Sequence, residues 1–267
     1  MLPVFAIGED GSLCLKPMVQ QIFEQLYACG FRQFYFIVGR GKRMIQDHFA
    51  PDREFVKRLG ALGKPGQALQ LEAFYTKLDD SNIVWVDQPE PRGFGDAIMR
   101  TESLVAGDPF LVHAGDDYIL SGRRPLPLRL VEAHSVGGAE ATLTVKRMDN
   151  PRQYGVAEVS GRGIFDVTRV EEKPPHPKSK FAIMAVYIFT NVIFDALKTT
   201  RPGVGGEVQL TDAIQELIKS GNKVQAVNLT KDDVRLDIGT PEKFWDTLEF
   251  AYHNARSKKR GAHGVVR

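Results

Sequence analysis

The repeated alternation of strand-like and helix-like segments is the feature that most constrains the fold of this chain. Short apolar runs, typical of buried strands, occur at residues 34–38, 83–86, 110–114 and 141–145. Helix-like segments precede and separate these runs, and the first begins at Lys16-Pro17 and stops at Gly30. This order predicts an α/β fold with a Rossmann-like, mostly parallel mixed sheet that is flanked by helices.

The pattern changes after Asn150-Pro151. Three strands are expected with no long helix between them, at residues 156–159, 164–170 and 181–189. A helix (209–219), a strand (224–229) and a last helix (241–255) follow. No internal repeat or low-complexity linker divides the chain, and residues 51–80 look like a charged helical excursion on the surface. We therefore predict one domain, 1–255, with a more antiparallel C-terminal half and a basic tail, 256–267.

Composition narrows the class of protein. Of 267 residues, 43% are hydrophobic and 25% are charged, which is typical of a soluble globular chain and excludes a disordered or fibrous one. No apolar run reaches the roughly 18 to 20 residues of a membrane span, and the N-terminus has no signal pattern. Cys14 and Cys29 lack the spacing of metal ligands and are expected to be free thiols. We predict a cytoplasmic protein that binds neither nucleic acid nor membrane, although the basic tail leaves that alternative open.

Candidate site residues lie where the predicted strands end, because ligands of parallel sheets bind at the carboxyl ends of strands. Gly115-Asp116-Asp117 follows the strand at 110–114, and Asp237 ends another strand. Two such carboxylates favour a Mg²⁺ site, although each acid alone could equally be a turn or helix-capping residue. The loop from Gln88 to Gly95 and the charged turn before Pro174 follow two further strands, and their alternative interpretations are a helix-entry loop and a solvated turn.

Taken together, these segments resemble the bacterial and archaeal UTP–glucose-1-phosphate uridylyltransferases, within the sugar-1-phosphate nucleotidyltransferase superfamily. The resemblance spans nearly the whole chain in the expected order. Its most specific parts are Gly39-Arg40-Gly41-Lys42-Arg43 and Gly206-Glu207-Val208-Gln209-Leu210-Thr211-Asp212-Ala213. The other matching segments are Met1 to Val4, Asp47 to Phe49, Gln88 to Gly95, Gly115 to Asp117, Tyr154-Gly155, Glu172 to Pro174 and Asp237 to Thr240.

The resemblance implies an activity and a set of roles. The activity is the reaction of UTP with glucose 1-phosphate to give UDP-glucose and pyrophosphate, by attack of the sugar phosphate on the α-phosphorus. Gln88, Gly93 and Gly115 would bind the nucleotide, with Gln88 and the backbone at Gly93 recognising the uracil edge. Gly155 and Glu172 would bind glucose, and Lys173 would contact the sugar phosphate. Asp116 and Asp237 would hold Mg²⁺, with Lys173 and Asp116 as the catalytic pair. A homo-oligomer is also expected.

The sequence departs from the family at its start. The family's glycine-rich phosphate loop lies upstream of the Met-Leu-Pro segment, so we expect the chain from Met1 to lack it and to be nearly inactive by itself. An insertion, Phe5 to Leu15, and Lys180 in place of asparagine are further departures. Two alternatives therefore stay open: a non-catalytic nucleotide-sugar-binding or regulatory subunit, and a thymidylyl or other sugar-1-phosphate nucleotidyltransferase.

Overall fold

The computed structural model describes residues 1–105 and 107–263. Its helices are α1 (Met18–Ala28), α2 (Arg43–His48), α3 (Arg53–Ala61), α4 (Pro65–Asp79), α5 (Phe94–Met99), α6 (Leu126–Gly137), α7 (Val192–Thr199), α8 (Leu210–Lys219) and α9 (Pro241–His263), with a 3₁₀ turn, η1 (Val204–Gly206). Its strands are β1 (Pro3–Ile7), β2 (Leu13–Pro17), β3 (Gln33–Gly39), β4 (Asn82–Gln88), β5 (Phe110–His113), β6 (Asp117–Leu120), β7 (Ala141–Arg147), β8 (Gly155–Ser160), β9 (Ile164–Glu172), β10 (Phe181–Phe189), β11 (Val224–Asn228) and β12 (Val234–Asp237).

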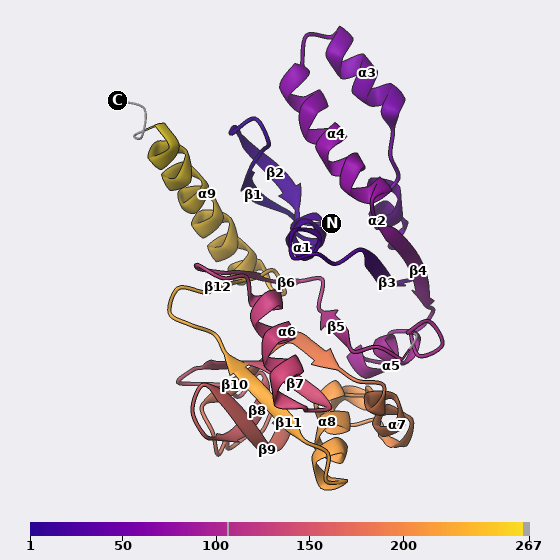
Figure 1. Ribbon diagram of the computed structural model, residues 1–267, viewed down its shortest axis with the longest axis vertical. Coiled ribbons are helices and arrows are strands. Elements are labelled where there is room, and N and C mark those ends of the chain that lie inside the picture. The colour runs from indigo at the N-terminus through magenta and orange to yellow at the C-terminus, as the bar shows by residue number, and fades with distance from the viewer. Residues whose placement is uncertain (106, 264–267) are drawn as a thin grey trace.

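A six-stranded sheet in the order β5-β10-β7-β11-β9-β8 forms the centre of the fold. β8 also pairs with the start of β10, which curls this end of the sheet. One face of β10, including Ile183 and Phe189, packs against α7 and α8, and the other, including Met184 and Val186, packs against α6. Helices therefore cover both faces of the sheet (Figure 1), as the α/β pattern predicts.

The expectation of a mostly parallel sheet needs a correction. Among the strand pairs of the described residues, only β3–β4 and β7–β11 are parallel. Parallel neighbours need a long crossover, which helices supply between β3 and β4 and before β11. The other pairs are antiparallel: short turns join β1 to β2 and β8 to β9, and β10 runs antiparallel between β5 and β7. The more antiparallel C-terminal half was predicted correctly.

A second apolar core lies beyond the central sheet, between α1, α4 and the β3–β4 pair. Its centre is aromatic: the ring of Phe23 meets Phe34 at 4.8 Å and Phe49 at 5.5 Å between centroids. α3 and α4 form a helical hairpin that extends away from the central sheet (Figure 1). This hairpin is the surface excursion expected for residues 51–80.

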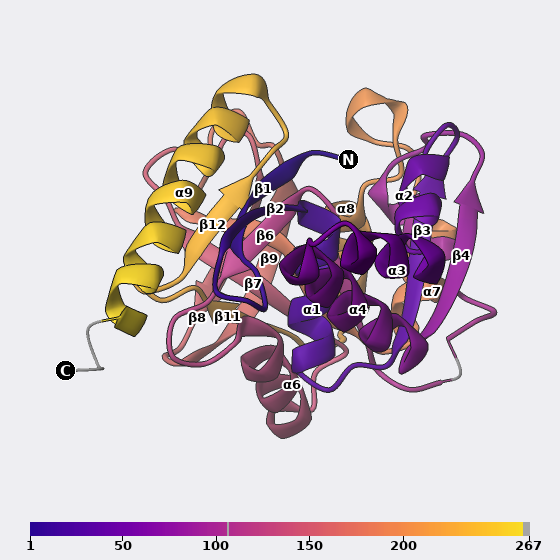
Figure 2. The ribbon, with the colours of Figure 1, turned by 90° about the horizontal axis from the view of Figure 1, so that it is seen from above.

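Five elements were missed or extended. Residues 5–15, taken as an insertion, contribute to an antiparallel hairpin, β1–β2. The helix α7 and the strand β6 were not predicted. Seen from above, α9 runs along one side of the β1–β2 hairpin, and α3 and α4 lie on the other side (Figure 2). It continues beyond Ala255 to His263, so part of the predicted basic tail is helical, and residues 264–267 of that tail lie outside the described residues.

None of the helices in the described part of the chain is long and apolar enough to span a membrane. The prediction that the chain does not bind a membrane surface stays a prediction.

Candidate functional site

Two of the predicted acids are brought together by the β6–β12 ribbon. The strands are antiparallel and place Asp237 opposite Asp117, and the amide of Ile238 donates to the carbonyl of Asp116 at 3.2 Å. Asp116 is exposed, and its carboxylate makes no hydrogen bond or ion pair with the residues that the structure describes. The side chain of Asp237 is 14% exposed. The candidate cation ligands therefore lie on adjacent backbone segments.

Asp237 is not a free carboxylate. Its Oδ2 contacts Lys243 Nζ at 2.8 Å and Arg235 Nη2 at 3.0 Å, and its Oδ1 accepts from the Gly239 amide at 2.8 Å. Burial acts to raise the pKa of Asp237, but Lys243, the Gly239 amide and Arg235 together hold this pKa below its ordinary value. Asp237 is therefore ionised, and it is neutralised by two side-chain cations.

Asp117 has a different role from its neighbour Asp116. Its carboxylate is 3% exposed and accepts two hydrogen bonds of 2.8 Å from Arg235 Nε. Desolvation raises the pKa of Asp117 despite the opposing effect of Arg235. Asp117 is thus an internal partner of Arg235, and Asp116 is the acid that faces solvent.

The residues expected to bind the sugar form a second group, at the paired ends of β8 and β9. Gly155 is opposite Glu172, whose Oε2 accepts from Thr211 Oγ1 at 2.6 Å. Lys173 Nζ lies 3.6 Å from Glu172 Oε1 and is half exposed. The backbone of Lys173 has φ +42°, a strained conformation for a non-glycine residue, and its amide donates to the carbonyl of Tyr154 at 3.1 Å.

One guanidinium joins these two groups. Arg235 Nη1 donates to Tyr154 Oη at 3.0 Å, while its other nitrogens contact Asp117 and Asp237. Arg235 and Tyr154 were not singled out from the sequence as site residues. A signal existed for Arg235, because alternate residues of a strand share a face and Arg235 precedes Asp237 by two positions.

The residues expected to recognise the base form a third group. Gln88 Nε2 donates to the carbonyl of Gly93 at 3.1 Å and to Asp96 Oδ2 at 2.9 Å. The amide of Gly95 donates to the carbonyl of Val208 at 2.9 Å. Since Thr211 contacts Glu172, the segment 207–211 lies between the base loop and the sugar group.

Glycine is required at position 93. Its φ is +106°, and a Cβ there would lie 2.8 Å from both Glu207 Cβ and the carbonyl oxygen of Val208. Gly115, in contrast, has open space around it, so the structure gives no steric reason for glycine there.

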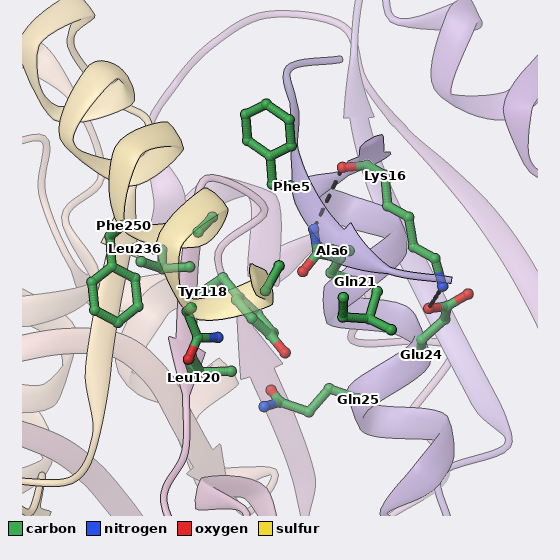
Figure 3. Close-up of a pocket in the computed structure, with 14 residues that line it drawn as sticks. Phe5, Ala6, Lys16, Gln21, Glu24, Gln25, Tyr118, Leu120, Leu236 and Phe250 are labelled. Atoms are coloured by element: carbon green, nitrogen blue, oxygen red, sulfur yellow. Dashed lines mark hydrogen bonds and ion pairs between the residues drawn. The ribbon is translucent and has the colours of Figure 1, made fainter. Parts of the chain in front are cut away.

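A cavity of about 330 Å³ lies behind the β6–β12 ribbon, between the β1–β2 hairpin, α1 and α9 (Figure 3). Tyr118 and Leu236 line it, and they are the pair next to Asp117 and Asp237 in the ribbon. Successive strand residues point to opposite faces, so this cavity lies on the other side of the ribbon from Asp117 and Asp237. None of the predicted site residues lines it.

The donor set fits a divalent cation with few protein ligands. In residues 1–105 and 107–263, no three His, Cys, Asp or Glu side chains gather in a metal-binding group. Mg²⁺ in phosphate-transfer sites is commonly held by one or two carboxylates together with substrate phosphates. Asp116 is available for this. Asp237 Oδ2 contacts both Lys243 and Arg235, so it can accept a cation if Lys243 moves away while Arg235 stays in place.

Proteins of known family are similar to this chain in sequence and in fold. The family model for nucleotidyl transferases matches residues 12–254. A relative from Streptococcus pyogenes, UTP–glucose-1-phosphate uridylyltransferase, is 33% identical over 256 residues, covering 91% of this chain and 81% of its own. A crystal structure of apo UDP-glucose pyrophosphorylase matches with a TM-score of 0.80 at 25% identity, covering 92% of this chain and 88% of that chain. UTP-bound UGPase from Acinetobacter baumannii matches with a TM-score of 0.77 at 22% identity, over 88% and 82%, which shows a shared fold.

Proposed function

The chain belongs to the nucleotidyl transferase family, and we propose that it transfers the uridylyl group of UTP to glucose 1-phosphate, producing UDP-glucose and pyrophosphate. The curated Streptococcus relatives carry that activity in their names. One observation in the structure carries the proposal. The β6–β12 ribbon pairs Asp237 with Asp117 and brings the backbone of Asp116 alongside it, and Arg235 connects Asp237 to Tyr154, beside the sugar group.

The reaction needs positioning and charge neutralisation more than proton transfer. An oxygen of the sugar phosphate, already ionised near neutral pH, forms a bond to the α-phosphorus. The bond from the α-phosphorus to the bridging oxygen breaks, and pyrophosphate leaves with the electron pair. No general base is required, so the work of the protein is to hold two anions in line.

The residues divide this work. Glu172 accepts from glucose hydroxyls beside Gly155, whose Cα lies against the Thr211–Glu172 hydrogen bond. Lys173, half exposed at the end of β9, contacts the sugar phosphate. Asp116 and Asp237 would hold Mg²⁺, which supplies charge neutralisation at the phosphates when bound. Lys243 would leave Asp237 Oδ2 when the cation binds there, and its ammonium would stay near the phosphates.

Base recognition rests on Gln88 and Gly93. Gln88 Nε2 donates hydrogen bonds to the Gly93 carbonyl and to Asp96 Oδ2. Gln88 Oε1 accepts no hydrogen bond from the residues that the structure describes. This oxygen suits the N3–H donor of uracil and disfavours cytosine, which has an acceptor at that position. Thymine has the same donor, so this contact does not separate UTP from dTTP.

The test is the release of pyrophosphate from UTP, dTTP or CTP by the full-length protein in the presence of glucose 1-phosphate. We expect UTP to be preferred, with CTP at least about tenfold slower because it loses a hydrogen bond and leaves an acceptor unpaired. Higher turnover with dTTP would favour the thymidylyltransferase alternative. Binding of UDP-glucose without any turnover would favour the non-catalytic one.

Asp116→Asn tests the site assignment. It keeps the shape of the side chain but removes the anionic ligand, so turnover should fall at least about a hundredfold, the scale of losing one electrostatic group. Near-normal Mg²⁺-dependent activity in this variant would contradict the assignment. Asp108→Asn, an exposed acid outside the site, is the control.

A further inference from the structure

Arg235 is a buried cation that the proposed reaction does not use directly. The structure assigns it a positioning role: Arg235 holds the Asp237 carboxylate and the Tyr154–Gly155 turn in one fixed arrangement, and so couples the cation side of the site to the sugar side. This inference rests on the proposed function and deepens it, by naming a residue that acts through its neighbours.

All sides of the guanidinium are engaged. Nε donates to both carboxylate oxygens of Asp117 at 2.8 Å, Nη2 lies 3.0 Å from Asp237 Oδ2, and Nη1 donates to Tyr154 Oη at 3.0 Å. The guanidinium carbon is also 5.1 Å from the centroid of the Tyr154 ring. A planar group with three separate partners fixes their relative directions, which the single ammonium of a lysine cannot do.

The partners of Arg235 explain why its position matters on both sides. Asp237 is a candidate cation ligand, and its Oδ2 is oriented by Arg235 and Lys243. Tyr154 precedes Gly155, and its carbonyl accepts the amide of Lys173. Displacing Arg235 therefore moves an acid on one side and the sugar-contacting turn on the other.

Burial separates this role from a surface ion pair. The side chain of Arg235 is 15% exposed and that of Asp117 is 3% exposed. Arg235 contacts Asp237 and Tyr154, and the proposed reaction gives it no contact with substrate, so it is a positioning residue and not a catalytic one. Arg129 offers a matched comparison, because its ion pair with Asp233 is equally buried, at 16% and 1% exposure, and involves none of the site residues.

The experiment compares Arg235→Lys, Tyr154→Phe and the control Arg129→Lys. Kinetics give kcat and the KM values for glucose 1-phosphate and UTP. Mn²⁺ binding is measured by electron paramagnetic resonance with protein and UTP alone, which needs no turnover. Thermal unfolding of each variant measures stability independently of both.

Arg235→Lys should weaken Mn²⁺ binding in the UTP complex and raise the KM for glucose 1-phosphate, each about tenfold or more, the usual scale for losing an outer-shell partner. Tyr154→Phe removes only the sugar-side hydrogen bond, so it should raise the KM for glucose 1-phosphate severalfold and leave Mn²⁺ binding unchanged. Arg129→Lys should lower the melting temperature without changing either measurement.

Two results would overturn the inference. One is an Arg235→Lys protein that is less stable but keeps wild-type Mn²⁺ affinity and KM values, which would make the ion pair purely structural. The other is a Tyr154→Phe protein with an unchanged KM for glucose 1-phosphate, which would remove the coupling to the sugar side. A wild type that binds Mn²⁺ and UTP but releases no pyrophosphate would contradict the proposed function instead. The Mn²⁺ affinities of the wild type and of Arg235→Lys would still test the role of Arg235.

Discussion

Replacing Gly155 with alanine tests the sugar group most directly, because this glycine is tightly enclosed. A Cβ at position 155 would lie 2.8 Å from Thr211 Oγ1, 3.2 Å from Glu172 Oε2 and 3.3 Å from Ile183 Cδ1. The backbone of Gly155 does not have a positive φ, so alanine introduces no backbone strain. The perturbation is therefore a steric one, applied at the hydrogen bond between Thr211 and Glu172.

The expected cost follows from these contacts. Thr211 Oγ1 must move away, which breaks its 2.6 Å hydrogen bond to Glu172. Overpacking a closed site costs about 1 to 3 kcal/mol of the unfolding free energy. If Glu172 moves with its partner, a glucose hydroxyl loses a charged acceptor worth about 1.5 to 3 kcal/mol, which corresponds to a rise of about 10- to 150-fold in the KM for glucose 1-phosphate.

The assay combines urea unfolding with initial rates of pyrophosphate release at varied glucose 1-phosphate and UTP. The KM for UTP should stay within about twofold, because the base group does not include Gly155. Thr211→Ala should make room for the new methyl group, so Gly155→Ala should destabilise less in that background than in the wild type. Gly60→Ala, in α3 with open space around it, is the control and should be neutral or stabilising.

One result would refute this reasoning: a destabilised Gly155→Ala protein with an unchanged KM for glucose 1-phosphate. It would show that Glu172 can move without affecting the sugar, so that Glu172 is not the acceptor of its hydroxyls. A rise in the KM for UTP alone would assign this turn to the nucleotide.

Three further predictions concern other parts of the site and the core. Gly93→Ala should cost about 1 to 3 kcal/mol of stability and raise the KM for UTP, because φ is +106° and backbone atoms block the new methyl group; urea unfolding and kinetics check this. Lys243→Met should lower the Mg²⁺ concentration for half-maximal turnover severalfold, since the ammonium no longer competes for Asp237; a higher requirement would contradict the geometry. Desolvation lowers the pKa of His113 to about 4 in the folded state, from about 6.5 in the unfolded state. As pH falls below about 6.5, the unfolded state therefore binds a proton that the folded state does not, and the free energy of unfolding should drop by up to about 3 kcal/mol by pH 4. Unfolding curves of His113→Gln measured across this pH range should lack that drop.

Much of the candidate site was predictable because its residues follow strands. Gln88 ends β4, Asp237 ends β12, and Lys173 directly follows β9, as the sequence patterns predicted. Local apolar runs indicate where a strand stops, and a polar residue at that point is visible without knowing the partner strand. The missed helix α7 and the missed hairpin β1–β2 lie where the apolar pattern was short and had no clear boundary.

What the sequence determined by itself is therefore local: the alternation that makes an α/β chain, the strand ends that carry Asp116, Glu172 and Gln88, and the motifs that resemble a family. The tertiary structure alone decided which of these ends meet. Arg235 and Asp117 are 118 residues apart, and their contact depends on the antiparallel register of β6 and β12. A shift of one residue in that register would turn Asp117 to the opposite face of the ribbon. Register is selected by the packing of the whole core, so no local pattern shows that a buried arginine ties the two halves of the site together.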